Sequence, residues 1–211
     1  MAACNGPIDS RSDDVPAMGS APAYGDTFIQ ASIGDIGGLI PSLTSDQSSH
    51  EVGGMIYDGL VKLDRDLKTV PSMAESWTYS RDCLELTFKL RRDVKWHDGR
   101  PFTADDVLFT YQTMINPKTP APFKEGFMLV KDVQAPDPYT VRVTYDKPYA
   151  RALETWNSYM LPKHVLQSFA EAGTLRESPQ NSHPVGTGPY RFQEWRPGEK
   201  VVLVANPDYF E

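Results

Sequence analysis

Hydrophobic and polar residues alternate most clearly in two stretches of this chain. Leucine and phenylalanine occupy every second position over residues 84–90, and tyrosine and valine do so over residues 139–145. This period of two predicts strands with one buried face, because successive side chains of a strand point to opposite sides of its sheet. A shorter run rich in β-forming residues, 27–33, ends at Gly34 and predicts a third strand that feeds a glycine-rich loop.

Apolar residues recur at helical spacing after Thr103. The Thr103 hydroxyl can accept a hydrogen bond from the amide of Asp106, whose carboxylate favours the positive end of a helix. Pro117 ends the predicted helix, because the residue before a proline disfavours helical backbone angles. The apolar side of this helix consists of Val107, Leu108, Tyr111, Met114 and Ile115.

Further elements follow from turn and cap residues. Residues 48–55 are expected to form a helix. Pro162 suits the first turn of another helix, for which Gly173 is the expected C-terminal stop. The last two predicted strands, which together are typical of a hairpin, are residues 190–195 and 200–204 around Pro197-Gly198.

A turn and two candidate acid–base pairs lie around the start of the helix after Thr103. Gly99 tolerates positive φ and Asp98 can bond to nearby backbone, so the chain is expected to reverse there. His97 is expected to face solvent beside this turn. Asp105 and Asp106 are adjacent on a helix and point about 100° apart, so they do not converge on one substrate atom. The sequence therefore predicts no catalytic residue.

Composition restricts the possible partners. The chain has 211 residues, of which 40% are hydrophobic, and a formal net charge of -7. Nucleic acids and anionic membrane surfaces bind basic patches, whereas the densest basic group, at residues 89–95, is expected to be a solvated face. These features exclude nucleic acid as a partner, and no stretch has the length and hydrophobicity of a transmembrane span.

The two cysteines, Cys4 and Cys83, and four scattered histidines lack the spacings of a disulfide framework or a zinc site, so no metal site is predicted. Cys4 follows Met1-Ala2-Ala3, and small residues before a cysteine are similar to the end of a bacterial lipoprotein signal. Cys4 is therefore a candidate lipidation site, with a chance cysteine in a tail as the alternative. Residues 1–23 are rich in Pro, Gly, Ser, Ala and Asp, which predicts a disordered tether.

A series of motifs occurs in the order found in one known family, from about residue 26 to the end of the chain. They are Ile56-Tyr57-Asp58-Gly59-Leu60-Val61, Met73-Ala74-Glu75-Ser76-Trp77, Phe88-Lys89-Leu90-Arg91, His97-Asp98-Gly99-Arg100-Pro101-Phe102-Thr103-Ala104-Asp105-Asp106-Val107, Met160-Leu161-Pro162-Lys163-His164-Val165, Gly186-Thr187-Gly188-Pro189-Tyr190-Arg191-Phe192 and Asn206-Pro207-Asp208-Tyr209. On these motifs the chain resembles the family 5 extracellular solute-binding proteins, which are the peptide- and nickel-type receptors of ABC importers.

This resemblance implies the N-terminal part of a two-lobed, mixed α/β fold, the type II fold of periplasmic binding proteins. Residues 24–44 and 170–211 would be parts of an incomplete lobe I, and residues 45–169 a subdomain inserted into it. Family members are much longer, so the chain is interpreted as an N-terminal fragment. The resemblance also implies a binding protein with no enzymatic activity and no cofactor.

The first candidate binding site is the loop of Gly34, Asp35, Ile36 and Gly37. Receptors of this class enclose a ligand with backbone groups and aromatic faces. The glycines allow close backbone approach, and Asp35 can meet a cationic group; alternatively, the glycines only turn the chain. Family members often have Leu-Asn-Pro or Leu-Asp-Pro at the end of this loop, where this chain has Leu39-Ile40-Pro41, so a polar anchor is missing.

Trp156 and Tyr159 form a second candidate wall, because an indole and a phenol offer flat apolar surface with a polar atom at one end. Packing in the core is the alternative for both. The glycines of Gly186-Thr187-Gly188 suit a crossover between lobes, so this motif is interpreted as structural and adjacent to a hinge. Cys83 stands where relatives usually carry glycine, which a turn tolerates only where positive φ is not required.

The function implied by the resemblance is that of the substrate-binding component of an ABC importer, which captures peptides or a similar small solute. Its partners would be this ligand and a membrane permease. Its location would be periplasmic or extracellular, with a lipid anchor in the native full-length form. The alternative is a non-catalytic interaction or scaffold protein made of a single lobe. Apolar surface left by an absent lobe also predicts a possible homodimer.

Overall fold

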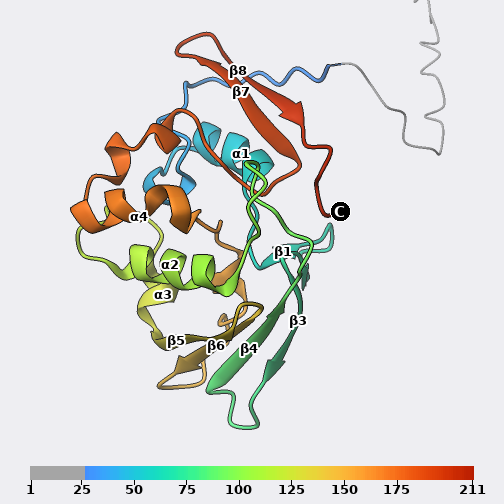
Figure 1. Cartoon of the computed structure of the whole chain (residues 1–211), viewed down its shortest axis with the longest axis vertical. Helices are drawn as coiled ribbons and strands as arrows, with labels where there is room; N and C mark the ends of the chain where they lie inside the picture. The colour runs from blue at the N-terminus through green and yellow to red at the C-terminus, as the bar shows by residue number, and fades with distance from the viewer. Residues whose placement is uncertain (1–26) are drawn as a thin grey trace, which may run out of the picture. The chain divides into compact units, whose positions relative to one another are not determined.

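Residues 27–211 are described by the computed structural model drawn in Figure 1. Residues 32–211 make one compact unit, and the architecture below is that of this unit. The candidate lipidation site Cys4 and the tether predicted for residues 1–23 lie outside the described residues.

The strand predicted at residues 27–33 is not formed. These residues have no regular secondary structure, and all of their side chains are exposed. A strand needs a neighbour that satisfies its backbone hydrogen-bonding groups. In the described part of the chain no strand pairs with residues 27–33. The prediction was wrong because β-forming residue types do not make a strand without that partner.

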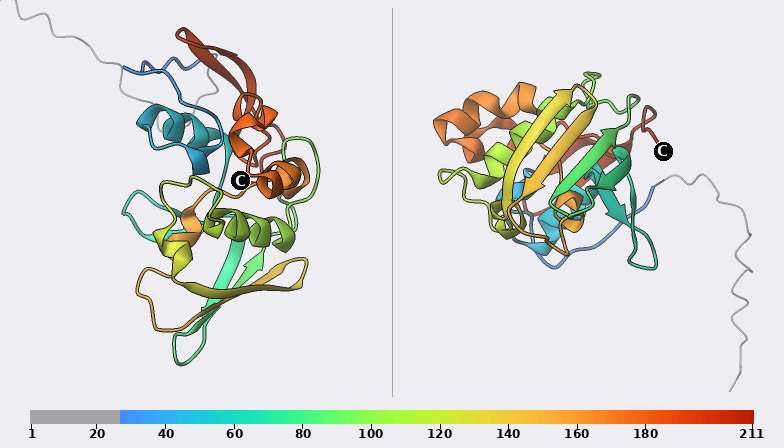
Figure 2. Two further views of the ribbon diagram at one scale, coloured as in Figure 1. Left: turned by 90° about the vertical axis from the view of Figure 1, so that its left-hand side faces the viewer. Right: turned by 90° about the horizontal axis from the view of Figure 1, so that it is seen from below.

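A four-stranded antiparallel sheet forms one end of the unit (Figures 1 and 2). Its order is β3-β4-β6-β5. The two central strands are those predicted from the alternating pattern, and Phe88 and Val141, directly opposite each other, are both fully buried. The strands are β3 (Ala74–Tyr79), β4 (Glu85–Leu90), β5 (Val130–Asp137) and β6 (Thr140–Tyr145).

The turn between β3 and β4 contains Cys83, which has a φ of 57°. This is the left-handed region that glycine occupies without steric cost and that other residues rarely adopt. Cysteine was expected to fit this turn only if the turn did not require positive φ. The turn does require positive φ, so this condition is not met. Hydrogen bonds hold this conformation: the Cys83 N–H donates to the carbonyl oxygen of Ser80 at 3.0 Å.

Two helices are stacked in layers on this sheet. Figure 2 shows α2 (Ala104–Ile115) between the sheet and α4 (Lys163–Ala172). The predicted start of α2 is confirmed, because Thr103 and Asp106 form a capping box in which the Asp106 carboxylate accepts from the Thr103 N–H at 3.0 Å. The predicted end of α4 is also confirmed, as Gly173 follows it with a φ of 77°.

The other end of the unit contains α1 (Gln47–Ile56) and a hairpin made of β7 (Tyr190–Arg196) and β8 (Lys200–Ala205) (Figure 1). The hairpin confirms the prediction made from the Pro-Gly turn. The remaining short elements are β1 (Val61–Leu63), β2 (Thr69–Pro71), α3 (Glu125–Met128) and the 3₁₀ helices η1 (Pro41–Leu43), η2 (Glu154–Asn157), η3 (Leu175–Glu177) and η4 (Pro179–Asn181).

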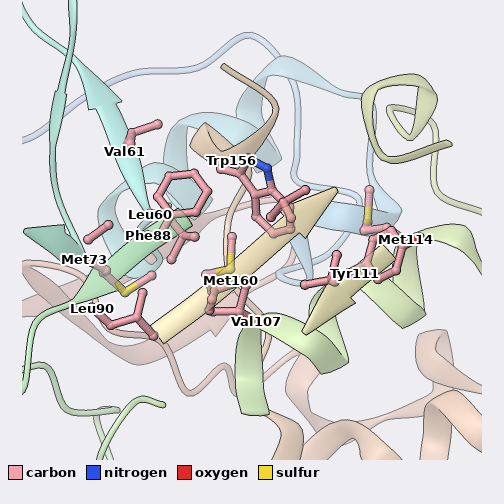
Figure 3. Close-up of a cluster of buried hydrophobic side chains, with 14 of the residues drawn as sticks. Leu60, Val61, Met73, Phe88, Leu90, Val107, Tyr111, Met114, Trp156 and Met160 are labelled. Carbon is pink, nitrogen blue, oxygen red and sulfur yellow. The ribbon is translucent and has the colours of Figure 1, made fainter. Parts of the chain in front are cut away.

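One large hydrophobic core joins most of these elements, and a second, smaller cluster of buried residues packs α4 with η1 and η3. Figure 3 shows Leu60, Phe88, Val107, Trp156 and Met160 gathered in the large core, and all of them are fully buried. Partly buried side chains of β7 also pack against this core. The predicted division into lobe I (24–44 and 170–211) and an inserted subdomain (45–169) stays a prediction.

Candidate functional site

The loop at residues 34–37 is fixed to two other elements through Asp35 and Gly37. Asp35 is exposed, and its Oδ2 accepts from the N–H of Gly198, in the turn of the β7–β8 hairpin, at 2.7 Å. Its Oδ1 accepts from the N–H of Ile36 at 2.9 Å. The Gly37 N–H donates to Ser49 Oγ of α1 at 2.9 Å. The loop therefore presents a carboxylate of defined orientation at the surface.

The residues of this loop differ in their exposure. Gly34, Asp35 and Gly37 are exposed, whereas the Ile36 side chain is buried in the core. Gly37 packs closely against the cap of α1, because a Cβ there would lie 3.0 Å from Asp46 Oδ2. Of the predicted loop contacts, Asp35 and the backbone of the glycines are accessible to a ligand, and the Ile36 side chain is not.

The end of the loop is anchored without the polar residue that relatives often carry. Leu39 and Ile40 are fully buried. The Leu39 N–H also donates to the carbonyl oxygen of Asn181 at 3.0 Å. Burial of two aliphatic side chains, each contributing about 2 kcal/mol, replaces the missing polar anchor.

Trp156 is a core residue in this structure (Figure 3). Its indole is fully buried, with the Phe88 and Phe127 ring centroids at 5.8 and 5.5 Å. Its Nε1–H donates to the hydroxyl of Tyr145 at 3.4 Å. An enclosed ring offers no surface to a solute, so the structure does not support the predicted ligand contact of Trp156 and instead gives the packing role.

Replacing Trp156 by alanine is expected to lower the free energy of unfolding by about 3–5 kcal/mol, because a large buried ring is lost and a cavity remains. The half-buried Trp77 of β3 provides the matched control, and Trp77→Ala is expected to cost clearly less. Urea denaturation of both variants measures the difference. Equal losses in the two variants would contradict the packing role.

Tyr159 is half-buried and lies beside α1. A Cβ added at Gly54 of α1 would lie 2.9 Å from the Tyr159 hydroxyl, so glycine at this position makes room for the phenol. Burial raises the pKa of Tyr159, and the nearby Asp58 raises it further. The structure thus brings the predicted residues Gly37 and Tyr159 to the same helix, while Trp156 faces the core.

Asp105 and Asp106 have separate structural roles. Asp105 is exposed and its Oδ2 lies 3.3 Å from Lys163 Nζ. Asp106 is buried and accepts hydrogen bonds from the Thr103 N–H, the Lys163 N–H at 3.1 Å and Trp96 Nε1 at 3.3 Å. The two carboxylates do not point to a common atom, in agreement with the expectation from their spacing.

A polar junction that the sequence did not predict surrounds the segment 186–188. The prediction that His97 faces solvent was wrong: its ring is half-buried and its Nε2 lies 3.0 Å from the Gly188 carbonyl oxygen. Thr187 Oγ1 lies 3.3 Å from Asp58 Oδ2, and the Tyr209 hydroxyl donates to Asp58 Oδ1 at 3.3 Å. Four of the family motifs therefore meet at one place. The family motifs marked these stretches of the sequence as candidates. They did not indicate which of their residues contact one another.

The carboxyl of Asp58 has a raised pKa because it is buried at this junction. Burial raises its pKa from 3.8 to about 6, while hydrogen bonds from Thr187 and Tyr209 lower it. Nearby Glu211 raises the pKa and Lys62 lowers it. A carboxyl whose folded pKa is raised binds its proton more tightly in the folded state. Its contribution to stability is therefore complete below about pH 4 and is lost as the pH rises through about 6.

The variant Asp58→Asn, which cannot ionise, is expected to gain stability relative to the wild type as the pH rises. Between pH 4 and pH 7.5 the gain is expected to reach up to about 3 kcal/mol. Urea denaturation of both proteins at each pH measures it, and groups that titrate in both proteins cancel in the difference. A difference between the proteins that is independent of pH would contradict the prediction.

Comparison with solved structures defines the class of protein. The chain matches NikZ from Campylobacter jejuni, solved with Ni(L-His), with a TM-score of 0.77 and 36% identity over 84% of this chain and 35% of that one. It matches AppA from Bacillus subtilis, solved with a nonapeptide, with a TM-score of 0.78 and 30% identity over 85% of this chain and 36% of that one. The structure is a mixed α/β fold of the type II periplasmic binding proteins.

Sequence comparison identifies the family. The profile of the bacterial extracellular solute-binding proteins, family 5 Middle, matches residues 68–211. Oligopeptide-binding protein AppA of Bacillus subtilis (strain 168) is 31% identical over 100% of this chain and 39% of its own length. Periplasmic oligopeptide-binding protein OppA of Escherichia coli (strain K12) is 29% identical over 93% of this chain and 39% of its own. The chain belongs to the family 5 bacterial extracellular solute-binding proteins, as its motifs predicted.

The chain spans about two-fifths of the length of these curated relatives. Among the described residues, no helix combines the length and the apolar character needed to cross a bilayer.

Proposed function

We propose that the chain is part of the substrate-binding component of an ABC importer and captures peptides or a similar small solute outside the cytoplasmic membrane. The observation that carries this proposal is the agreement in both fold and sequence with a protein solved in complex with a nonapeptide, at a TM-score of 0.78 and 30% identity. Relatives named as oligopeptide-binding and di/tripeptide-binding proteins also align with most of the chain.

The exposed loop at residues 34–37 is the proposed ligand contact. The Asp35 carboxylate accepts one backbone hydrogen bond at each oxygen, from Ile36 and from Gly198. A carboxylate has about four lone-pair directions, so acceptor capacity remains for the ammonium group of a ligand. The two existing bonds also fix the orientation of the carboxylate, which lowers the entropic cost of binding. The half-buried Tyr159 beside α1 is the second proposed contact.

The proposed partners are the captured solute and a membrane permease. A periplasmic or extracellular location is supported by the naming of a relative as a periplasmic binding protein. Lipidation of Cys4, outside the described residues, would hold the protein at the membrane. Binding requires no chemical reaction of the solute, and the relatives are substrate-binding proteins.

We also propose that the chain forms a homodimer. Three large apolar side chains near α3 support it, because Phe123, Met128 and Leu129 are 59, 57 and 55% exposed. Exposed apolar patches mark association surfaces in many soluble proteins. Light scattering is expected to give a mass above 23.6 kDa for the 211-residue chain at high concentration. A strict monomer would contradict the homodimer and leave solute capture unaffected.

Transport by the host tests the proposed function. Disruption of the gene is expected to reduce uptake of an isotope-labelled mixture of short peptides, and the intact gene is expected to restore it. A gene with Asp35→Ala is expected to restore less uptake. Asp66→Ala, which changes an exposed carboxylate in the turn between β1 and β2, is the matched control and is expected to restore it fully. Uptake that does not depend on the gene would contradict peptide transport.

A further inference from the structure

The turn that follows β1 (Figure 1) holds a leucine in an unfavourable backbone conformation. Leu67, which lies between β1 and β2, has a φ of 61°. In this left-handed region the Cβ of an L-residue approaches the following carbonyl oxygen closely, so glycine and asparagine are its usual occupants. Many hairpin turns contain a residue in this region, and it is most often glycine. Leucine at this position therefore destabilises the folded chain.

The side chain of the same residue is exposed to solvent. Leu67 is 78% exposed, and Leu63, at the end of β1, is 46% exposed. An apolar side chain stabilises a fold by leaving water, so these two leucines contribute little to the stability of the unit. Strained backbone is found most often at functional segments. The combination of strain and exposure at Leu67 points to an interaction outside the unit that offsets both.

Hydrogen bonds hold the turn in this shape. The Asp64 N–H donates to the carbonyl oxygen of Lys68 at 2.9 Å, and the Leu67 N–H donates to that of Asp64 at 3.0 Å. Asp64 Oδ1 accepts from the N–H groups of Asp66 and Lys68 at 2.9 and 2.8 Å. At the base of the hairpin, Val61 is fully buried in the core. This rigid support fixes Leu67 before any partner binds, which lowers the entropic cost of binding.

A free positive charge lies beside this leucine. Arg65 is exposed, and within residues 27–211 its guanidinium has no hydrogen-bond or ion-pair partner. The other charged groups of the turn are engaged, since Lys68 Nζ lies 3.9 Å from Asp66 Oδ2 and Asp64 accepts backbone hydrogen bonds. A partner that fits this turn has an apolar pocket for the leucine and a carboxylate at the rim of the pocket for the guanidinium.

We propose that Leu67 and Arg65 form a docking knob with which the chain binds the extracytoplasmic face of the membrane permease. Leu67 enters an apolar pocket of the permease, and Arg65 pairs with a carboxylate beside that pocket. Burial of the leucine on docking offsets its strain and exposure in the free chain. The knob rests on the proposed function, because the permease is the partner which that function requires. It uses none of the residues proposed to contact the solute.

The stability of the free chain tests the strain at Leu67. Asparagine adopts the left-handed region more readily than leucine, so Leu67→Asn is expected to raise the midpoint of urea denaturation. Cys83→Asn is the matched control, because Cys83 is also exposed in a hairpin turn and has a φ of 57°. Its midpoint is expected to rise as well. The two variants relieve the same kind of strain, and only one of them removes the knob. A lower midpoint for Leu67→Asn would overturn the proposal.

Uptake by the host separates docking from solute capture. Each variant is expressed at the same limiting amount in a host whose own gene is disrupted, and the uptake of labelled short peptides is measured. Leu67→Asn is expected to lower the rate about tenfold, because burial of a leucine strengthens association by about that factor or more. Cys83→Asn and Asp66→Ala are expected to keep the wild-type rate. The amount of solute bound per molecule, measured by native mass spectrometry, is expected to be the same in all of them.

The outcomes distinguish the knob from the proposed function. A wild-type rate with Leu67→Asn, or an equal loss with Cys83→Asn, would overturn the knob and leave solute capture unaffected. A wild-type gene that restores no uptake would overturn the proposed function, and the knob with it.

A photo-reactive benzophenone amino acid at position 67 identifies the occupant of the knob in intact cells. A crosslink to a membrane subunit of the importer is expected, and the same amino acid at position 83 is expected to give none. A crosslink to a second copy of the chain would overturn the permease as the partner. The absence of any crosslink from position 67 would overturn the knob.

Discussion

Gly186→Ala is expected to lower the free energy of unfolding by about 4 kcal/mol or more, which places the variant near global unfolding. A Cβ at this position would lie 1.9 Å from the carbonyl oxygen of Ile56 and 2.7 Å from its carbonyl carbon. These atoms belong to the backbone at the end of α1, so no rotation of a side chain relieves the overlap. The same carbonyl oxygen accepts from the Gly188 N–H at 2.8 Å, and any displacement weakens that bond.

Gly34→Ala is the matched control for this prediction. At Gly34 the nearest atom to an added Cβ is Ser48 Oγ at 3.9 Å, an ordinary contact distance. This variant is expected to stay within about 1 kcal/mol of the wild type. Urea denaturation of the two variants measures both effects. A Gly186→Ala protein as stable as Gly34→Ala would show that the packing of segment 186–188 against α1 is not as described.

Asp106→Ala is expected to cost about 3–5 kcal/mol of stability. The buried carboxylate is the acceptor for three donors from different parts of the chain, namely the backbone N–H groups of Thr103 and Lys163 and the indole N–H of Trp96. Its removal leaves these donors without a partner in a buried site, and each unsatisfied donor costs about 1–3 kcal/mol. Thermal or urea unfolding followed by circular dichroism measures the loss.

Asp105→Ala provides the control within the same turn of α2. Its carboxylate is exposed and pairs with Lys163 Nζ at 3.3 Å, an arrangement that contributes less than about 1 kcal/mol. The adjacent variants are therefore expected to differ by several kcal/mol. Similar losses in both would contradict the role of Asp106 as the link between the starts of α2 and α4.

Features that depend on neighbours in the sequence could be predicted from it. The capping box of Thr103 and Asp106 and the glycine stop at Gly173 involve residues within one helical turn of the helix end. The hairpin around Gly198 and the strands β4 and β6 follow from a turn residue and from alternation. In each case the residues that give the signal lie within a few positions of one another in the sequence.

Features that depend on distant partners could not be predicted. His97 contacts Gly186 across 89 residues, and Asp58 contacts Thr187 across 129 residues. The alternation that marks β4 and β6 has no counterpart for Trp156, whose burial depends on the packing of Phe88 and Phe127 around it. Residues 27–33 have the composition of a strand but no paired strand in the described chain.

Residues of several family motifs that lie far apart in the sequence contact one another in the structure. Asn206 Nδ2 donates to the Gly188 carbonyl oxygen at 3.0 Å, and the Ile56 carbonyl oxygen accepts from the Gly188 N–H at 2.8 Å. Together with His97 and Asp58, these contacts bring motif residues as far as 151 positions apart to one junction. Their order along the chain predicted the family, and the structure explains their residue types by their contacts with segment 186–188.

Native mass spectrometry of the protein purified from its own host without denaturant tests the central claim most directly. The proposed function predicts a peptide or similar small solute bound at one molecule per protein and released on denaturation. Fragmentation of the released material then identifies the class of solute. A protein that carries no solute and is found only as a complex with itself or with another protein would contradict solute capture and favour an interaction role.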